Sequence, residues 1–193
     1  MLVERFNTRS QAKFYIESHG GDFSDYELEH ETFYHSLDSL QKQLSQVMKY
    51  KMIGRSFVPS YIFSEKNLII VIGQDGLVAN TAKYSNGIPI IAVNPDVKRY
   101  DGVLLPYHAG NFITGVDSVL SGTVRLRTAR FAEARLNDGQ RLLAFNDLFI
   151  GTSSHISARY KLNFKECEEQ QSSSGIIIST KAGATGWLSS IFN

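Results

Sequence analysis

The chain has 193 residues, enough for one large domain or two small ones with a hydrophobic core. Its 42% hydrophobic and 20% charged residues are typical of an ordinary globular protein, and a formal net charge of +1 argues against binding to nucleic acid or to an anionic membrane. The single cysteine, Cys167, excludes an internal disulfide and a cysteine-rich metal site. Because no apolar run approaches the ~18 residues that span a bilayer, and the start does not resemble a signal peptide, we expect a cytoplasmic protein.

Two helices are predicted before residue 50. Asn7 or Thr8 can cap the first, over residues 8–18. The second covers residues 24–48, where apolar residues recur at intervals of four and three and form one stripe of a helix. The members of this stripe are Phe33, Leu37, Leu40, Leu44 and Val47. A stripe of barely two heptads predicts a helix that packs on a core or covers a sheet rather than a free coiled coil.

The next region predicts a parallel sheet. Residues 68–72 are consecutive apolar residues, mostly β-branched, as in a strand that is buried on both faces. A helix is predicted over 77–84 and a second buried strand over 87–94. Strands that alternate with helices indicate βαβ units and a Rossmann-like α/β domain. In such a sheet Asp75 and Asn94 would be neighbours at the carboxyl ends of the strands.

The segment Gly73-Gln74-Asp75-Gly76 follows the first of these strands directly. Its glycines let the backbone turn sharply and approach a ligand closely, and its amides, with the N-terminus of the next helix, can bind a phosphate. Because a carboxylate repels phosphate, Asp75 would instead hold a hydroxyl group or Mg²⁺. The alternative is a plain strand-to-helix turn with an aspartate near the N-cap.

The second half of the chain is predicted to be rich in β-strands. We place a boundary between an α/β domain over 1–110 and a mainly antiparallel β-rich domain over 111–193. A short helix is predicted over 117–120, and only a loop over 170–174. Strands are predicted over 124–128, 132–136, 141–145, 157–164 and 175–180. The second and third of these strands flank an Asp-Gly pair, which is a strong hairpin signal.

Two segments of the second half carry groups that suit a nucleotide. Asn146-Asp147 interrupts an apolar run, and is either directed to a ligand or part of a strand-end turn. Residues 179–187 place hydroxyls, glycines and Lys181 after a buried strand, where they can bind ribose and phosphate. Trp187 can lie against a base or pack in a core. The histidines lack metal-ligand spacing, and the complete Walker A, Gly-x-Gly-x-x-Gly and Gly-x-Ser-x-Gly motifs are absent from the sequence.

Four collinear motifs resemble those of the NAD kinase family. That family carries Gly-Gly-Asp-Gly, a following Asn, Asn-Glu, and a segment similar to Ser-Thr-Pro-Thr-Gly-Ser-Thr-Ala-Tyr. The corresponding residues here are Gly73-Gln74-Asp75-Gly76, Asn94, Asn146-Asp147, and Ser179-Thr180-x-x-Gly183-x-Thr185-x-Trp187. The resemblance covers most of the chain from about residue 65 onward.

The resemblance implies that NAD binds between the α/β domain and the β-rich domain. It implies that Asp75 is the catalytic residue that holds or deprotonates the adenosine 2′-hydroxyl of NAD, while ATP with Mg²⁺ donates a phosphoryl group. The motifs imply further substrate-binding residues, which are Gly73, Gln74, Gly76, Asn94, Asn146, Asp147, Lys181, Thr185, Trp187 and Ser190. No nucleic-acid or membrane partner is expected, and family analogy suggests a homodimer or homotetramer.

The chain departs from the family pattern at several positions. Gln74 replaces a glycine and narrows the phosphate turn, and Asp147 is one methylene shorter than glutamate. Ser174 stands where the family usually has aspartate, and 181–182 replace Pro-Thr. Because the family continues beyond the position of Asn193, the second domain is expected to be incomplete. Two alternatives therefore stay open: a related kinase that acts on a sugar or lipid hydroxyl, and a catalytically silent nucleotide sensor.

Overall fold

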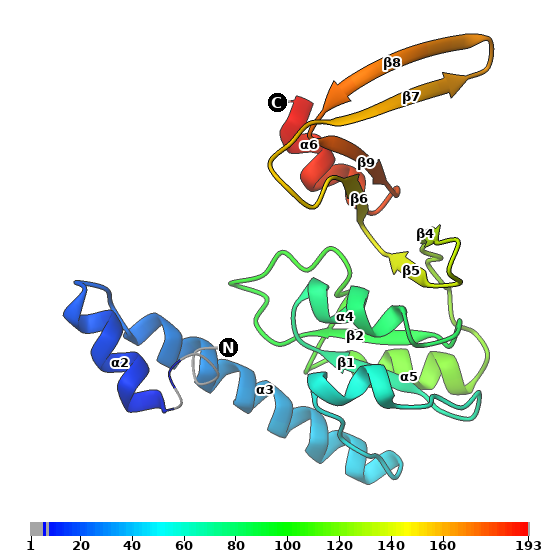
Figure 1. Ribbon diagram of the computed structural model, residues 1–193. Coiled ribbons are helices and arrows are strands. Elements are labelled where there is room, and N and C mark those ends of the chain that lie inside the picture. Colours follow the sequence, from blue (N-terminus) through cyan, green and yellow to red (C-terminus); the bar gives the residue numbers. More distant parts are fainter. Residues whose placement is uncertain (1–5, 7, 193) are drawn as a thin grey trace. The chain divides into compact units, whose positions relative to one another are not determined.

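The structure is a computed structural model that describes residues 6 and 8–192, and the chain forms two compact units (Figure 1). Unit 1 comprises Met1–Thr81 and Ile88–Val124, and unit 2 comprises Ala82–Gly87 and Arg125–Asn193. Helix α5, which the sequence assigns to the second domain, therefore belongs to unit 1.

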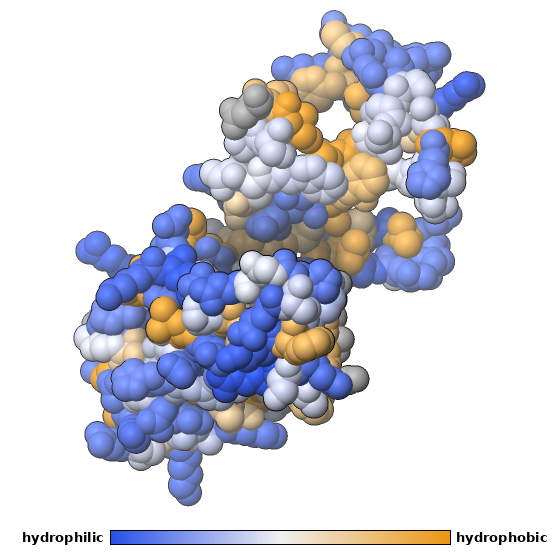
Figure 2. All heavy atoms as spheres, turned by 90° about the vertical axis from the view of Figure 1, so that its left-hand side faces the viewer, coloured by the Kyte–Doolittle hydropathy of each residue, from blue (hydrophilic) through white to orange (hydrophobic). Residues whose placement is uncertain are grey.

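Two helices, α2 (Arg9–Ser18) and α3 (Ser24–Val47), lie side by side at the start of unit 1 (Figure 1). The Thr8 hydroxyl caps α2 by accepting a hydrogen bond from the Gln11 amide at 3.2 Å. Both predicted helices are confirmed to within a residue at each end. Figure 2 shows that hydrophilic side chains cover most of the face these helices present, with apolar side chains in small groups.

A parallel sheet forms the centre of unit 1. Its strands lie in the order β1 (Ile69–Ile72), β2 (Ile90–Asn94) and β3 (Tyr107–His108). Helix α4 (Asp75–Ala82) connects β1 to β2, and α5 (Phe112–Leu120) follows β3. This βαβ arrangement is the Rossmann-like α/β domain that the sequence predicts.

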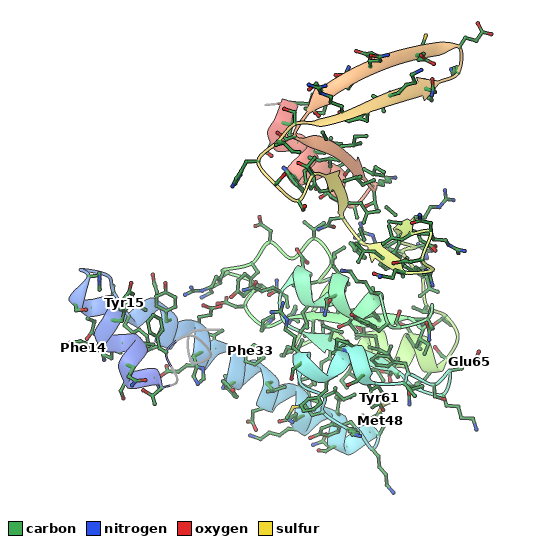
Figure 3. The ribbon with its side chains drawn as sticks, viewed as in Figure 1. Phe14, Tyr15, Phe33, Met48, Tyr61 and Glu65 are labelled. Atoms are coloured by element: carbon green, nitrogen blue, oxygen red, sulfur yellow. The ribbon has the colours of Figure 1, made fainter. Side chains whose placement is uncertain are left out.

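Two hydrophobic clusters hold helices against the sheet. The first joins α3 and α5 to β2, with Met48 at the end of α3 packed against it (Figure 3). Its buried members are Leu40, Leu44, Ile91, Val93, Phe112 and Val116. The second cluster joins α4 to β1 and β2 through Ile69, Val71, Val78, Ala92 and Leu105. Because successive side chains of a strand face opposite sides, both faces of the sheet are covered, which explains the nearly continuous apolar sequence of the strands.

Unit 2 is built of antiparallel strand pairs, as the sequence predicts. The pairs among its described residues are β4 (Ala132–Arg135) with β5 (Arg141–Ala144), β6 (Asp147–Gly151) with β9 (Gly175–Ser179), and β7 (Ala158–Phe164) with β8 (Cys167–Ser173). The chain continues through a short 3₁₀-helix, η2 (Gly183–Thr185), and helix α6 (Trp187–Phe192). Gly139 has a φ of +88° in the β4–β5 turn, which suits the predicted Asp-Gly hairpin.

Four local predictions are wrong. Residues 124–128 form no strand, because the segment leads from unit 1 into unit 2 and Leu126 is exposed. Strand β8 occupies most of the predicted loop at 170–174. The sequence did not predict this strand because its mostly polar, exposed side chains show no alternation of apolar and polar residues. Helices α4 and α5 begin earlier than predicted, with Asp75 and Phe112 as their first residues. A short 3₁₀-helix, η1 (Arg55–Ser60), precedes β1.

None of the described helices is long and apolar enough to cross a membrane.

Candidate functional site

In the turn after β1, Gly73 is buried against the protein, whereas Gln74 and Gly76 are exposed. Gly73 has a φ of +155°, and a Cβ at this position would lie 2.9 Å from a Leu77 methyl carbon. The Gly73 amide donates to the Val93 carbonyl at 3.2 Å, which holds the turn at the end of β2. At Gly76, a Cβ would have no atom within 4 Å, so the space beside the first turn of α4 is free for a ligand.

Asp75 begins α4 and is bound to a distant loop. Its Oδ1 accepts a hydrogen bond from the Leu104 amide at 2.8 Å, and its Oδ2 accepts one from the Val103 amide at 3.2 Å. An ionised carboxylate offers about four acceptor positions, so two remain for a ligand. The side chain is half-buried, so part of its surface is accessible to a ligand. This arrangement fixes the direction of the carboxylate without using up its acceptor capacity.

Asn94, the last residue of β2, organises the same loop. Its side chain is buried, with 4% exposure, and its Nδ2 donates to the Tyr100 carbonyl at 2.9 Å. Its Oδ1 accepts from the Asp96 amide at 2.9 Å. Gly102 packs closely against this side chain, since a Cβ at position 102 would lie 2.7 Å from Asn94 Nδ2. Asp75 and Asn94 are thus brought to one loop, where the Asn94 side chain bonds to the chain itself.

Gln74, which stands in place of a family glycine, contacts the Tyr100 side chain. Burial, followed by the hydrogen bond to Glu29, raises the pKa of the Tyr100 phenol, and a hydrogen bond with Gln74 lowers it in part. The hydrogen bonds of Asp75 to Val103 and Leu104 join the turn after β1 to the loop after β2.

The second group of predicted residues lies in unit 2. Asp147 begins β6 and pairs with Ser179 of β9, so Asn146 and Asp147 adjoin the turn that follows β9. The Asn146 side chain is exposed, while its carbonyl accepts a hydrogen bond from the Thr180 amide at 2.8 Å. The Oδ1 atom of Asp147 is buried and has no hydrogen-bond partner among the described residues. Because an unpaired buried carboxylate oxygen is costly, a donor from a ligand would stabilise it.

The Thr180 side chain connects the residue before Asn146 to the turn after β9, although the sequence analysis did not name Thr180 as a binding residue. Its hydroxyl donates to the Phe145 carbonyl at 2.6 Å and accepts from the Ala182 and Gly183 amides, each at 3.2 Å. A Ser or Thr that ends a strand and precedes a turn is the local signal for such bonds. A Cβ at Gly183 would lie 2.4 Å from the Asn146 carbonyl oxygen, so only glycine fits there.

The remaining predicted residues of unit 2 differ in their freedom to bind. Lys181 and Thr185 are exposed. Trp187 is 49% exposed, and the centre of its ring lies 5.8 Å from that of Phe149. The Ser190 hydroxyl donates to the Trp187 carbonyl at 2.7 Å, inside α6. Trp187 is therefore neither a core residue nor fully free: one part of it contacts Phe149 and the rest faces outward.

A glycine turn at the carboxyl end of a strand, in a parallel sheet covered by helices on both faces, places unit 1 in the Rossmann-like class of α/β folds. Comparison with known proteins gives a more specific relationship. No family model matches the chain. The NAD kinase of Heliobacterium modesticaldum is 28% identical over 130 residues, which are 63% of this chain and 44% of that protein.

Two further relatives agree with the first. The NAD kinase of Chlorobium phaeobacteroides is 30% identical over 129 residues, 63% of this chain and 43% of its own length. The NAD kinase of Prosthecochloris aestuarii is 30% identical over 138 residues, 67% of this chain and 47% of its own length. The matched part of the chain is thus similar to these NAD kinases, which agrees with the resemblance of its motifs, and the chain spans less than half the length of these relatives.

Proposed function

We propose that the protein transfers a phosphoryl group from ATP to the 2′-hydroxyl of the adenosine ribose of NAD and so forms NADP. The main support is Asp75 in the glycine turn at the carboxyl end of β1, in a chain related to proteins named NAD kinase. Phosphoryl transfer requires positioning and charge stabilisation more than covalent chemistry from the protein. The exposed Gln74 and Gly76 of the turn, beside the oriented carboxylate of Asp75, can supply both requirements.

Asp75 would act on the acceptor hydroxyl. The Val103 and Leu104 amides hold its carboxylate in one orientation, and its free lone pairs can accept a hydrogen bond from the 2′-hydroxyl. As the bond between the 2′-oxygen and the γ-phosphorus of ATP forms, the bond from that phosphorus to the bridging oxygen breaks and ADP leaves. The hydroxyl proton passes to the carboxylate, which is general-base catalysis. Because the amides fix the carboxylate in advance, little reorganisation is needed during the reaction.

Mg²⁺ would reach this site with ATP. No cluster of three or more histidine, cysteine, aspartate or glutamate side chains in the described parts of the chain could hold a metal ion. Mg²⁺ is usually bound by substrate phosphates with one or two carboxylates, and Asp75 is the carboxylate of the glycine turn. Bound Mg²⁺ neutralises charge on the phosphate oxygens during transfer.

The Asn146-Asp147 pair would bind NAD. We expect Asn146→Ala to weaken NAD binding by about 1–3 kcal/mol, through the loss of hydrogen bonds to the dinucleotide. Because the Asn146 side chain is exposed, the free energy of unfolding should hardly change. Calorimetric titration with NAD measures the affinity, and Asn163→Ala, at an exposed asparagine of β7, is the control. Wild-type affinity for NAD in Asn146→Ala would mean that the Asn146-Asp147 pair only forms a turn at the end of a strand and does not bind NAD.

Trp187 would form a wall of the NAD site. Because it is the only tryptophan and its ring is half-exposed, NAD bound against it should change the emission of the protein. A fluorescence titration should follow the same binding curve as calorimetry. Unaltered emission, in the presence of calorimetric binding, would remove Trp187 from the site.

A second candidate function is the binding of NAD or ATP without turnover. It is favoured by one observation, the two backbone amides on the Asp75 carboxylate, which are also what a purely structural aspartate would show. Incubation of the purified protein with ATP, Mg²⁺ and NAD, followed by an assay for NADP, separates the two. NADP formation supports the kinase, and binding of NAD without any NADP supports the sensor.

A further inference from the structure

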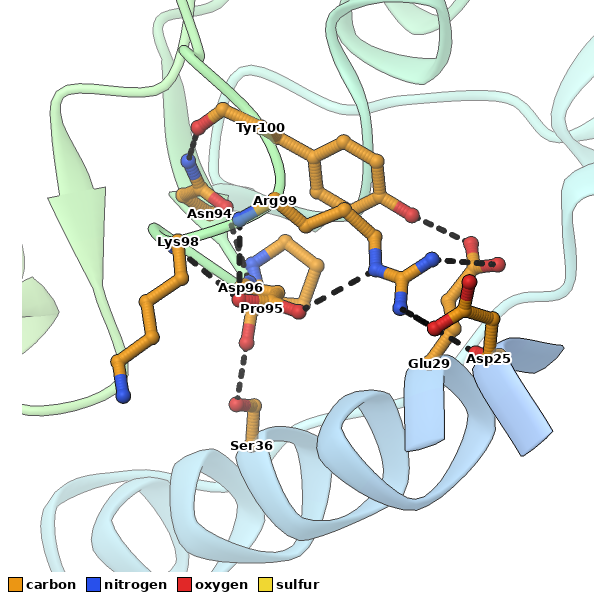
Figure 4. A network of polar contacts seen from close by, with 9 residues as sticks. All are labelled: Asp25, Glu29, Ser36, Asn94, Pro95, Asp96, Lys98, Arg99 and Tyr100. Carbon is orange, nitrogen blue, oxygen red and sulfur yellow. Dashed lines mark hydrogen bonds and ion pairs between the residues drawn. The ribbon is translucent and has the colours of Figure 1, made fainter. Parts of the chain in front are cut away.

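The loop that holds Asp75 is itself attached to helix α3. We call residues 95–105, between β2 and β3, the anchor loop. One end of it donates the Val103 and Leu104 amides to the Asp75 carboxylate. Figure 4 shows its other end, where the side chains of Arg99 and Tyr100 extend from the loop to acidic residues of α3.

Arg99 lies among several carboxylates. Its guanidinium nitrogens are 4.0 Å from Asp25 Oδ1, 4.0 Å from Glu29 Oε2 and 3.7 Å from Asp96 Oδ2. Its Nη2 also donates to the Asp25 backbone carbonyl at 3.2 Å. Single partly exposed ion pairs stabilise little, but a guanidinium shared by several acceptors is restricted in direction. Arg99 therefore connects the anchor loop to the N-terminal part of α3 at several points.

Tyr100 and Ser36 provide two further connections. The Tyr100 hydroxyl donates to the Glu29 carboxylate, so Arg99 and Tyr100 share one glutamate (Figure 4). Farther along α3, the Ser36 hydroxyl donates to the Pro95 carbonyl at 2.7 Å.

We propose that Arg99 and Tyr100 are positioning residues for the phosphoryl transfer, because they fix the anchor loop to α3 and thereby direct its amides at the Asp75 carboxylate. The proposal rests on the proposed kinase function. Neither side chain needs to touch a substrate: the effect passes from α3 through the anchor loop to Asp75. Loosening the loop would leave Asp75 in place on α4 but let its carboxylate rotate away from the acceptor hydroxyl.

The chain offers a matched pair of variants. Arg9 on α2 binds Glu27 at 2.8 Å, just as Arg99 approaches Glu29 two residues farther along the same helix. Arg9 lies on α2, outside the anchor loop. We expect Arg99→Ala to lower kcat for NADP formation about tenfold or more, with KM for NAD within about twofold of wild type, because small misplacements of a reacting group are costly. Arg9→Ala should leave both constants unchanged. Tyr100→Phe, which keeps the ring, should lower kcat severalfold.

Two measurements separate positioning from a general loss of structure. If Arg99 acts through Asp75, its effect on kcat should largely disappear in an Asp75→Asn background, as a double-mutant cycle would show. Hydrogen exchange of the Val103 and Leu104 amides, followed by NMR, should become at least about fivefold faster in Arg99→Ala, because their carboxylate partner holds them less well. Exchange elsewhere in β1 and β2 should stay at the wild-type rate.

The outcomes are distinct. Unchanged exchange of the two amides in Arg99→Ala, or faster exchange with wild-type kcat, would overturn the proposal, and so would kcat effects that add fully to those of Asp75→Asn. Wild-type protein that forms no NADP would overturn the proposed function and the catalytic part of this inference. The exchange rates would then decide by themselves whether Arg99 holds the loop.

Discussion

Asp75→Asn is expected to lower the rate of NADP formation by at least about a hundredfold. Loss of a general base typically costs about 10²–10⁴-fold in rate, and asparagine removes the base while keeping nearly the same shape. NAD affinity should remain close to wild type, because the Asn146-Asp147 pair is unchanged. Steady-state assays at saturating ATP and NAD, with calorimetry for NAD, measure the two quantities.

The same substitution tests the structural role of Asp75. Its two carboxylate oxygens accept from Val103 and Leu104, whereas asparagine keeps only one oxygen. We therefore expect a modest loss of about 1 kcal/mol in the free energy of unfolding, which is too small to explain the rate. Asp101→Asn changes an exposed carboxylate of the same loop and should alter neither quantity. Near wild-type turnover in Asp75→Asn would exclude Asp75 as the base and favour a structural aspartate.

Much of the fold follows from local sequence patterns. The apolar run over 68–72 predicts β1 because a strand covered on both faces has no polar side, and Thr8 predicts the start of α2 because its hydroxyl replaces a missing helical acceptor. Strand β8 could not be predicted in this way. Most of its side chains are exposed and polar, and its pairing with β7 makes it a strand.

The candidate site shows the same limit. Motif positions identify Asp75 and Asn94, and the carboxyl ends of parallel strands bring both to one loop. Their partners are not predictable from local patterns. The amides that donate hydrogen bonds to Asp75 lie 28 and 29 residues farther along the chain, and their positions depend on the path of the whole loop. Arg99 gave no signal in the sequence for a similar reason: its acidic neighbours on α3 precede it by about seventy residues.

Gly183→Val is expected to have the largest structural effect in unit 2. Even the first added carbon would lie 2.4 Å from the Asn146 carbonyl oxygen and 2.7 Å from Asp147 Oδ1. A backbone carbonyl held by the Thr180 amide cannot move aside easily, so β6 and the turn after β9 must separate. Overpacking of this kind costs about 3 kcal/mol, and we expect urea unfolding followed by Trp187 emission to shift accordingly.

Binding of NAD should fail in Gly183→Val more severely than in Asn146→Ala. The substitution displaces both members of the Asn146-Asp147 pair, and each hydrogen bond of about 1.4 kcal/mol is worth a factor of ten in affinity. Ala184→Val, at the exposed neighbouring position, adds the same side chain without meeting β6 and should leave stability and affinity near wild type. If Gly183→Val binds NAD as tightly as Ala184→Val does, the turn after β9 does not form the NAD site. If both lose affinity equally, the turn itself and not its contact with Asn146 is what NAD requires.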